Sequence, residues 1–366
     1  MTTDCPSIDP RYLAGPTPAA LLGLGTAVPP HKLDQREIAA MARDLFAERY
    51  PDFERLVSVF YTAGIASRHV VMPREWYMQE HHWPDRTEAY LKGAEALFID
   101  AAGKALSAAG LAAPEVDTIV TVSSTGIATP SLEARVAGVM GFHPNVTRVP
   151  VFGLGCAGGA AGLSLAARLA EARPGTNVLM VAVEICSVAI RLDQLNKANI
   201  VATALFADGA AAAVLRAGAG DGGLCKVEGA GEHTWPDTLD IMGWNVDPEG
   251  LGVIFDREIP PFAERNFGPA IEAILGRMGL TKADVDRFCC HPGGSKVIMA
   301  LEETLALERR ALDHERSVLA DFGNMSAPTV FFVLERLMQA GLPGRTALTA
   351  LGPGFSAHCL SLTRRL

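Results

Sequence analysis

The segment GLAAPEVDTIVTVSS at residues 110–124 recurs in outline as GLTKADVDRFCCHPG at residues 279–293. The two segments begin 169 residues apart, and two Pro-Gly pairs, at residues 174–175 and 343–344, keep the same separation. Each copy predicts the same order of helix, short loop, strand, loop, helix, Pro-Gly turn and strand. The repeat therefore indicates two similar α/β halves within one chain.

The stretches 118–122 and 177–183 are short and apolar, which is typical of strands that helices cover on both faces. Helical spacing of apolar residues predicts helices over 90–109 and 269–278. We expect a mixed or parallel sheet in an αβαβα layered fold of two duplicated halves. A boundary at the glycine-rich residues 217–222 would give an N-terminal half of residues 1–220 and a C-terminal half of residues 221–366. An ordinary loop explains that segment equally well.

Composition excludes several classes of protein. The 366 residues are 49% apolar, which suits a large core and not a disordered chain. The net charge of −9 argues against a nucleic-acid partner, because such a surface needs a positive field. Seven cysteines without a CxxC spacing predict neither a disulfide framework nor a zinc site, and reduced thiols favour a cytoplasmic location. Arg168 and Glu184 interrupt the long apolar runs, so we expect no membrane span, which needs about 20 apolar residues.

Cys156 lies in VPVFGLGCAGGAAGLSLAARLAE, residues 149–171. Residues 149–152 predict the end of a strand and residues 157–171 a helix, so we expect the cysteine at a helix N-terminus. Backbone N–H groups and the helix dipole favour a thiolate there. The flanking glycines would leave room for an acyl group. A buried cysteine that serves only as a small apolar side chain explains the segment equally well.

The same segment contains Gly153-x-Gly155-x-x-Gly158, and Glu184 follows at the end of the next predicted strand. This spacing is similar to a dinucleotide-binding fingerprint, in which the acid contacts a ribose hydroxyl. The motif lies inside the duplicated unit, however, and a Cys156 thiolate would repel a pyrophosphate. An NAD-binding oxidoreductase is therefore a remote alternative.

Two further polar residues lie at the ends of predicted elements. His291 follows the apolar residues Phe288–Cys290 and precedes a Pro-Gly-Gly turn, which is where open α/β sheets place their sites; a structural histidine is the alternative. Asn324 precedes a predicted helix, which suits a simple N-cap. The 169-residue repeat nevertheless places it opposite Gly155, beside Cys156. We expect two helix N-termini to meet at a pseudo-twofold axis, one with a thiol and the other with an amide.

The combination of GCAGG around Cys156, HPGG from His291 and GNMSA around Asn324 resembles the thiolase superfamily. The sequences HPGG and GNMS resemble motifs of the type III polyketide synthases, the chalcone synthase-like enzymes. LFADGAAAAVL at residues 205–215 and GPGF at residues 352–355 are similar to further segments of that family. The resemblance covers nearly the whole chain and implies a thiolase-like fold. It extends to the family members that make long-chain alkylpyrones and alkylresorcinols.

The resemblance implies a set of catalytic roles. Cys156 would carry the acyl group of a starter acyl-CoA. His291 would hold the thiolate as an ion pair and later donate to the thioester oxygen. Asn324 would orient malonyl-CoA and, with His291, form an oxyanion hole for the enolate that forms as CO₂ leaves. Repeated decarboxylative Claisen condensation and cyclisation would give a pyrone or a resorcinol- or phloroglucinol-type product, with no cofactor beyond the CoA thioesters.

The resemblance also assigns a substrate pocket. Phe206 matches a gatekeeper phenylalanine, and Val253 replaces a second one, which should widen the cavity mouth. Thr129 matches a residue that reaches across the interface of a homodimer, and Thr125 and Cys186 match positions that open onto an acyl tunnel in long-chain members. The other matched positions are Ala189, Gly243, Ser326, Gly352, Pro353 and Gly354. Small lining residues favour a long-chain or bulky aliphatic starter, and plain core packing is the alternative for each position.

Binding of the anionic CoA is matched only in part. Arg55 matches a CoA-facing arginine of the family, whereas Asp52 and Val59 fall where the family has lysines. Arg68 is a further candidate. The sequence therefore predicts a basic patch for CoA but shows little of it.

Three other functions fit parts of the sequence. A ketoacyl synthase that primes fatty-acid synthesis has the same Cys-His-Asn order, although its histidine motif usually reads His-Gln-Ala-Asn. A papain-like cysteine peptidase has this order too, but such chains place the cysteine near the mature N-terminus and use disulfides. A non-catalytic scaffold is the last alternative, and the presence of all three polar residues argues against it. The neighbouring His81 and His82 would diverge on a helix or a strand and predict no metal site.

Overall fold

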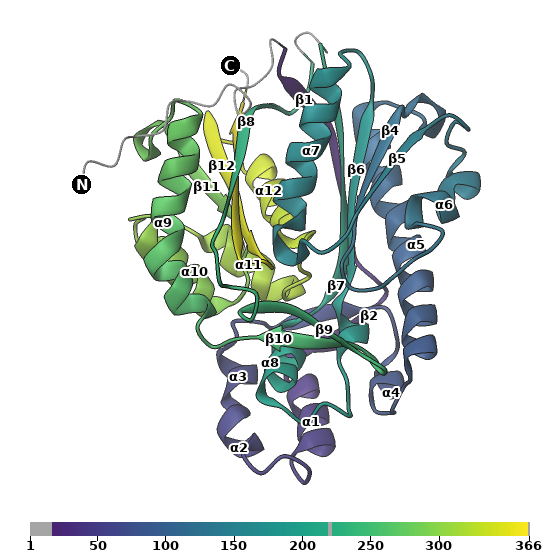
Figure 1. Ribbon diagram of the computed structural model, residues 1–366, viewed down its shortest axis with the longest axis vertical. Helices are drawn as coiled ribbons and strands as arrows, with labels where there is room; N and C mark the ends of the chain where they lie inside the picture. The colour runs from purple at the N-terminus through teal and green to yellow at the C-terminus, as the bar shows by residue number, and fades with distance from the viewer. Residues whose placement is uncertain (1–16, 219–221, 365–366) are drawn as a thin grey trace.

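The computed structural model describes residues 17–218 and 222–364. The strands of its main sheet are β1 (Ala19–Ala27), β4 (Thr118–Val122), β5 (Thr147–Val151), β6 (Val178–Ile185), β7 (Asp208–Ala217), β8 (Cys225–Thr234), β11 (Arg287–Cys290), β12 (Arg345–Gly352) and β13 (Ser356–Thr363). These nine strands lie in the order β11-β12-β13-β8-β1-β7-β6-β4-β5 (Figure 1). Pairing is parallel between β11 and β12 and between β4 and both of its neighbours, and antiparallel elsewhere. The sheet is therefore mixed.

The sheet consists of two parts that meet at β1 and β8. These two strands pair through Ala20 with Lys226 and Leu21 with Cys225. The part β1-β7-β6-β4-β5 comes from the N-terminal side of the sequence and the part β8-β13-β12-β11 from the C-terminal side. Each part has its own helices, as the sequence repeat predicts.

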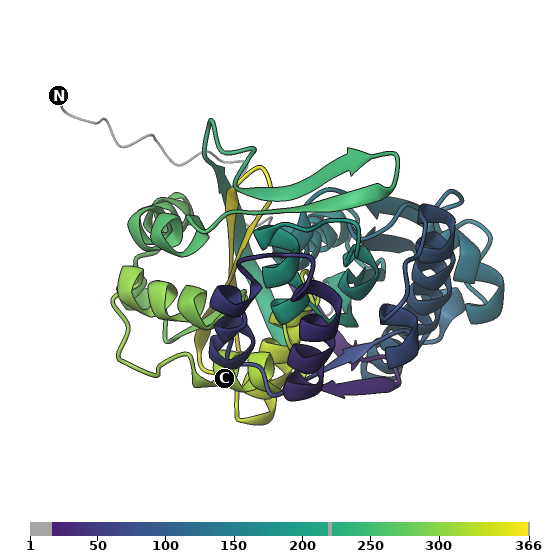
Figure 2. The same ribbon diagram turned by 90° about the horizontal axis from the view of Figure 1, so that it is seen from below.

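Helices separate and cover the two parts of the sheet. The helices α7 (Gly158–Ala172) and α12 (Thr329–Gln339) lie between them and contact strands of both. The helices α5 (Trp83–Ala109) and α6 (Leu132–Met140) cover the outer face of the N-terminal part, and α9 (Ile259–Arg277), with α10 (Ser295–Thr304) packed on it, covers that of the C-terminal part (Figures 1 and 2). This arrangement confirms the predicted αβαβα fold.

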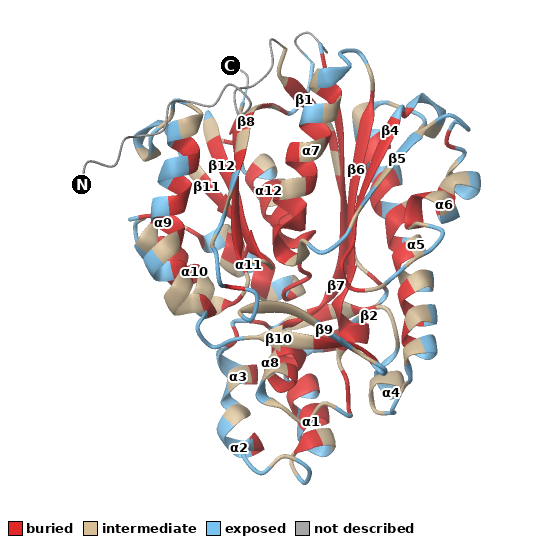
Figure 3. Ribbon diagram, viewed as in Figure 1, coloured by how far each residue is buried: buried red, intermediate tan, exposed pale blue. Residues whose placement is uncertain are grey.

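The central helices approach closely because glycine occupies their contact surface. A Cβ atom at Gly159 would lie 2.3 Å from the carbonyl oxygen of Ala327, and one at Gly158 would lie 2.7 Å from Cγ1 of Val122. Only a residue without a side chain fits at such distances. Figure 3 shows α7 and α12 as mostly buried. The close approach brings the N-terminal end of α7 beside the chain that leads into α12.

Smaller elements pack around the sheet, most of them below it in Figure 1. The first helix, α1 (Gln35–Phe46), begins with a capping box in which Asp34 accepts from the backbone N–H of Arg36 at 2.8 Å and Glu37 accepts from that of Asp34 at 3.3 Å. The others are β2 (His31–Asp34), α2 (Phe53–Leu56), α3 (Ser58–Thr62), β3 (Ser67–Val70), α4 (Arg74–Tyr77), α8 (Lys197–Leu205), β9 (Met242–Asp247), β10 (Gly250–Phe255) and α11 (Asp313–Phe322). The strands β9 and β10 form a hairpin separate from the main sheet.

The predicted elements of the repeat differ from the structure mainly at their ends. The strand expected over 118–122 is β4, and that expected over 177–183 is β6, which continues to Ile185. The helix expected over 90–109 begins earlier, at Trp83, with a proline in its first turn. The predicted start of a helix at Pro269 is wrong, because α9 begins at Ile259 and runs through that proline. Burial of one face on both sides of Pro269 outweighs the hydrogen bond that the proline cannot donate.

The predicted boundary at residues 217–222 includes residues 219–221, which lie outside the described residues, so that division stays a prediction. Within the described ranges, no helix is long and apolar enough to cross a membrane. The same ranges contain no group of His, Cys, Asp or Glu side chains that could hold a metal ion.

Candidate active site

Cys156 lies in a single 3₁₀ turn, Gly155–Ala157, directly before α7. Gly155 has a φ of +45°, and a Cβ atom on it would lie 2.8 Å from the Pro353 ring. A Cβ atom on Gly352 would lie 2.5 Å from that of Ala157. The loop of Gly352, Pro353 and Gly354 therefore packs directly on the cysteine turn, and its glycines make that approach possible.

His291 follows β11 as expected, and its backbone N–H donates to the carbonyl of Thr349 at 2.9 Å. The residue is 5% exposed, and neither ring nitrogen has a hydrogen-bond partner among the described residues. Burial lowers the pKa of His291 to about 4. An unpartnered buried imidazole is able to accept a proton from a neighbour that enters its cavity.

Asn324 is held through both its side chain and its backbone. Its Nδ2 donates to the carbonyl of Gly293 at 3.1 Å, and its Oδ1 accepts from the backbone N–H of Ser326 at 2.8 Å. The N-cap reading is wrong, because the N-cap of α12 is Pro328. The amide is instead fixed beside the loop that follows His291.

Cys156, His291 and Asn324 line the same buried cavity. Most of the other lining residues come from β12, α9, α10 and the β9–β10 hairpin and include Met242, Phe255, Ile259, Val297 and Thr349. The structure therefore brings together the three residues that the sequence singled out.

Burial in the cavity disfavours a charge on the Cys156 thiol alone or on the His291 ring alone. Burial raises the pKa of the Cys156 thiol to about 11, although hydrogen bonds with the side chains of Ser326 and Asn324 act in the opposite direction. Moving the thiol proton to His291 leaves the pair with no net charge and creates two opposite charges that attract each other in a poorly screened site. The arrangement therefore favours proton transfer within the pair over ionisation of either member.

A wide entrance joins this cavity to the surface. The entrance has a volume of about 760 Å³ and shares Phe255, Ile259, Gly293 and Val297 with the cavity of Cys156. Its rim carries four cationic side chains, which are Arg55, Lys197, Arg257 and Lys296, and two acidic ones, Asp240 and Asp256. Sequence reasoning found only Arg55, because the other cations come from three segments that folding brings together.

Arg68 is wrong as a CoA contact. The residue is 2% exposed, and its guanidinium donates to the carbonyls of Thr203, Ala204 and Phe206 at 2.5–2.8 Å and also to the side chain of Gln35. These carbonyls belong to the C-terminal end of α8, where the helix dipole favours a cation. Burial lowers the pKa of Arg68 to about 9. Arg68 faces the interior of the protein and caps a helix.

The chain matches two family descriptions. They are chalcone and stilbene synthases, N-terminal domain, over residues 11–219, and chalcone and stilbene synthases, C-terminal domain, over residues 226–359. The chain belongs to the chalcone and stilbene synthase family.

Relatives from bacteria agree with this assignment. A putative chalcone synthase of Bacillus subtilis (strain 168) is 35% identical over 93% of this chain and 98% of its own length. A 1,3,6,8-tetrahydroxynaphthalene synthase of Streptomyces peucetius subsp. caesius is 38% identical over 92% of this chain and 91% of its own. The crystal structure of the corresponding synthase from Streptomyces coelicolor A3(2), a bacterial type III polyketide synthase, has a TM-score of 0.89 at 29% identity and covers 95% of this chain and 99% of its own. The protein is a type III polyketide synthase.

The nucleotide-binding and peptidase alternatives are wrong for this type III polyketide synthase. Glu184, which was the candidate ribose ligand, is fully buried and accepts from the backbone N–H of Ser124 at 3.0 and 3.1 Å and from the hydroxyl of Thr125 at 2.8 Å. Burial raises the pKa of Glu184 to about 8. Gly158 serves the packing of α7 described above and not the approach of a phosphate.

The pocket residues expected in a type III polyketide synthase fall into different places. Val253 lines the entrance, and Ser326 hydrogen-bonds with the Cys156 thiol. Thr125 and Ala189 line a separate small cavity with Trp83, Arg86 and Leu251. Cys186 is buried in the core, and Gly243 lies on β9 opposite Ile254. Thr129 is exposed and lines none of the cavities described above.

Val253 lacks an aromatic ring, as expected, but a nearby phenylalanine supplies one. Phe255, two residues further on the same face of β10, meets Phe206 edge to face with ring centroids 6.0 Å apart. Phe255 therefore places a ring at the mouth of the cavity, whereas Phe206 packs behind it and lines neither the cavity nor the entrance. The sequence could have revealed Phe255, because residues two apart in a strand lie on the same face and Phe255 is two residues after Val253.

His81 and His82 take no part in the site. The His81 ring stacks on Trp76 at 3.9 Å, and Nε2 of His81 is 2.8 Å from the carbonyl oxygen of the same residue. His82 is the N-cap residue of α5 and is exposed. We expected both to be surface loop residues; His82 is exposed, whereas His81 is half-buried against Trp76.

Proposed function

We propose that Cys156 is the acyl-carrying nucleophile of this synthase and that His291 and Asn324 act on it and on malonyl-CoA. The observation that carries the proposal is the single buried cavity that these three side chains line, next to a cation-rimmed entrance with which it shares four lining residues. The thiol of Cys156 loses its proton to His291 and attacks the thioester carbon of a starter acyl-CoA. Coenzyme A leaves as its thiolate and takes a proton, and the acyl group remains on sulfur.

Extension requires a carbanion, which the loss of CO₂ supplies. Malonyl-CoA loses CO₂ and its thioester oxygen takes the negative charge of an enolate. The Nδ2 of Asn324 and the His291 ring are the donors placed for that oxygen, an arrangement that is worth several kcal/mol in comparable sites. The enolate carbon attacks the Cys156 thioester, a carbon–carbon bond forms, and the cysteine thiolate leaves. Each step balances without a metal or an organic cofactor.

The four cations at the entrance support the expected CoA site. CoA carries phosphates, and Lys197, Lys296 and Arg257 are exposed at the rim together with Arg55. Arg55 also bonds Asp52 at 3.2 Å, so that part of its charge is already compensated. We propose that Lys197 and Lys296 supply most of the attraction that the sequence did not reveal.

The small cavity of Thr125 and Ala189 supports a long or bulky aliphatic starter. It lies between α5 and the hairpin, and it shares Trp83 and Thr87 with a more open groove on the outer side of α5. An acyl chain that entered this cavity would meet the apolar side chains of Val188, Ala189 and Leu251. We propose an acyl-CoA of this class as starter and a pyrone or resorcinol-type product.

An edge strand supports the expected homodimer. The strand β5 ends the main sheet and its residues are exposed or half-buried, which leaves backbone groups free to pair with another strand. The apolar side chains of Ile127, Val139 and Phe152 are more than half exposed near Thr129 and β5. We propose that a second copy covers this region; Phe152→Asp should then lower the mass measured by sedimentation.

The six cysteines of the described residues are free, which supports a cytoplasmic location.

The test of the main proposal is mass spectrometry of the protein after incubation with a pool of acyl-CoAs. Cys156 should gain the mass of one acyl group, and malonyl-CoA should then give a polyketide product. The variant Cys156→Ala should gain no acyl mass. Acylation elsewhere on the wild-type chain, with none at Cys156, would overturn the proposal.

A further inference from the structure

The β9–β10 hairpin is the shared roof of the active-site spaces. Met242 and Phe255 line the cavity of Cys156, Val253 to Phe255 line the entrance, and Gly250 and Leu251 line the cavity of Thr125. The hairpin strands pair with each other and with no other strand of the described chain. The distance of the hairpin from the opposite walls of these cavities therefore depends on contacts other than those of the main sheet.

The base and the middle of the hairpin have few polar contacts with the rest of the protein. The indole Nε1 of Trp244 donates to the carbonyl of Ser124 at 2.7 Å. At the base, the backbone N–H of Asp256 donates to the carbonyl of Ile241 at 3.0 Å, which closes the hairpin on itself. The remaining anchor lies at the tip.

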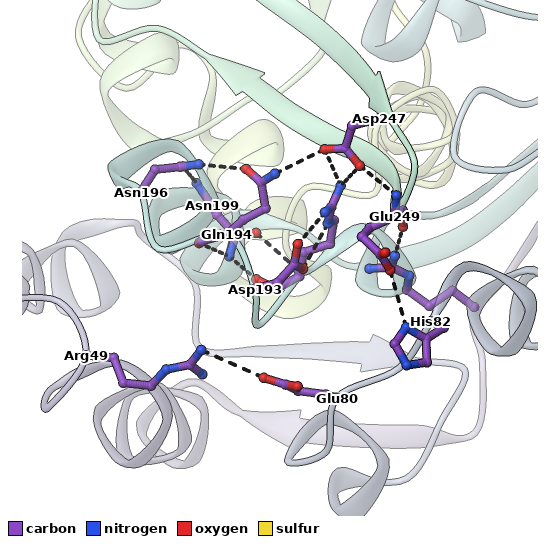
Figure 4. Close-up of polar contacts among 11 residues, drawn as sticks. Arg49, Glu80, His82, Asp193, Gln194, Asn196, Asn199, Asp247 and Glu249 are labelled. Atoms are coloured by element: carbon purple, nitrogen blue, oxygen red, sulfur yellow. Dashed lines mark hydrogen bonds and ion pairs between the residues drawn. The ribbon is translucent and has the colours of Figure 1, made fainter.

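The tip is held by an ion pair between Arg191 and Asp247. The guanidinium Nη1 of Arg191 lies 2.7 and 2.8 Å from the two carboxylate oxygens of Asp247. Gln194 adds a contact at 3.3 Å to the same carboxylate. Figure 4 shows Asp247 at the centre of these contacts, above Gln194 and Asp193. The Arg191 side chain is 2% exposed and that of Asp247 is 26% exposed, so water reaches the pair mainly from the carboxylate side.

Arg191 is itself held rigidly. Its guanidinium also binds Asp193, with Nε 3.0 Å from that carboxylate. The side chain of Asn199, in α8, accepts from the backbone N–H of Arg191 at 3.3 Å and donates to its carbonyl at 2.6 Å. The hairpin is thus tied to a fixed point and not to a mobile side chain.

Arg191 adjoins the wall that faces the hairpin across the cavity of Thr125, the space in which we propose that the acyl chain lies. Arg191 comes two residues after the 3₁₀ turn Cys186–Ala189, which places Ala189 in the cavity of Thr125. A second tie lies nearby, where the buried Arg86 donates to the carbonyl of Glu249 and the exposed His82 lies 3.3 Å from the carboxylate of the same residue. Figure 4 shows His82 beside Glu249. The ion pair therefore spans the distance between roof and wall.

We propose that the Arg191–Asp247 ion pair is a specificity-determining clamp that fixes the separation of the hairpin roof from the Cys186–Ala189 wall and so limits the size of the acyl group that the synthase accepts. The inference rests on the proposed function, because it assumes that the starter occupies the space beneath the hairpin. Neither residue touches the reacting atoms, so both are positioning residues.

The experiment compares starter selection in three variants. The wild-type protein and each variant receive an equimolar pool of saturated acyl-CoAs from hexanoyl to stearoyl, and mass spectrometry measures the acyl groups on Cys156. Asp247→Asn keeps the shape of the side chain but removes its charge. Asp247→Glu keeps the charge. Glu228→Gln breaks another two-pronged pair with an arginine, Arg345, at 3.2 and 3.4 Å, and neither residue lines any of the spaces beneath the hairpin.

Asp247→Asn should shift the distribution towards longer acyl groups, with the ratio of the longest to the shortest adducts rising about fivefold. Asp247→Glu and Glu228→Gln should keep the wild-type distribution, although Glu228→Gln loses a comparable ion pair. An unchanged distribution in Asp247→Asn would overturn the clamp, and so would an equal shift in Glu228→Gln, because the effect would then be one of general stability. Absence of any acyl group on wild-type Cys156 would instead overturn the proposed function.

Discussion

Phe206 and Asn324 lie side by side in a parallel β-bridge. The backbone N–H of Asn324 donates to the carbonyl of Leu205 at 2.9 Å, and its carbonyl accepts from the N–H of Ala207 at the same distance. The candidate catalytic amide is thereby fixed to the end of α8. The same end of α8 is held from the other side by the guanidinium of Arg68.

Arg68→Met should therefore damage both stability and the alignment of Asn324. The substitution leaves the carbonyls of Thr203, Ala204 and Phe206 buried without their donor, so we expect a loss of about 3 kcal/mol in the free energy of unfolding. Urea denaturation measures this loss. Arg49→Met, which removes a partly exposed arginine paired with Glu80 at 3.8 Å, is the control and should change stability by about 0.5 kcal/mol or less. Equal effects of the two substitutions would contradict the buried role.

His291→Ala should move the alkylation of Cys156 to higher pH. Burial raises the pKa of the thiol to about 11 and no other base lines the cavity among the described residues, so the thiolate should appear in the variant only as the pH approaches that value. In the wild type the proposed transfer of the proton to the imidazole should let alkylation proceed at lower pH. The rate of iodoacetamide addition against pH measures the difference. Superimposable profiles for the two proteins would show that His291 does not act on the thiol.

The sequence predicted that Cys156, His291 and Asn324 come together better than it predicted their surroundings. Cys156 and His291 each follow a strand and precede a helix, and Asn324 lies in the turn between α11 and α12. Such junctions leave local signals in glycine and proline. The duplicated sequence added the expectation that the two helix N-termini meet, and the cavity of these residues bears this out.

The surroundings depend on contacts between distant segments, which leave weaker signals. Nothing near Arg68 in the sequence shows that its side chain points inward, because its partners are backbone carbonyls more than 130 residues away. The entrance cations likewise come from separate elements, with Lys197 at the start of α8 and Lys296 in α10. Phe255 was within reach of the strand periodicity, but the motif comparison drew attention to Val253 alone.

Asn324→Ala should separate loading from extension. The side chain is a candidate donor to the enolate and is not needed to attack the starter thioester, so Cys156 should still gain an acyl group. Decarboxylation of malonyl-CoA should fall about 100-fold, the usual effect of losing one oxyanion-hole donor. Release of labelled CO₂ measures it. A variant that decarboxylates normally but fails to load the starter would reverse the roles assigned here.

Lys296→Ala should weaken the binding of malonyl-CoA. The side chain is exposed at the entrance rim, so we expect KM to rise about threefold, with kcat little changed. The effect should shrink in high salt, because ions screen exposed charges. Lys32→Ala removes an exposed lysine of β2, away from the entrance, and is the matched control. A salt-independent change in KM, or an equal change in Lys32→Ala, would argue against an electrostatic contact with CoA.

Val253→Phe should narrow the mouth of the cavity. Val253 lies on the same face of β10 as Phe255, which already meets Phe206 edge to face, so a second ring would fill part of the space that an acyl chain has to cross. We expect acylation of Cys156 by stearoyl-CoA to slow about tenfold relative to hexanoyl-CoA. Val246→Phe adds the same ring to an exposed position of the neighbouring strand and should leave the ratio unchanged. If Val253→Phe slows both substrates equally, then the position acts on access of CoA in general and not on the length of the starter.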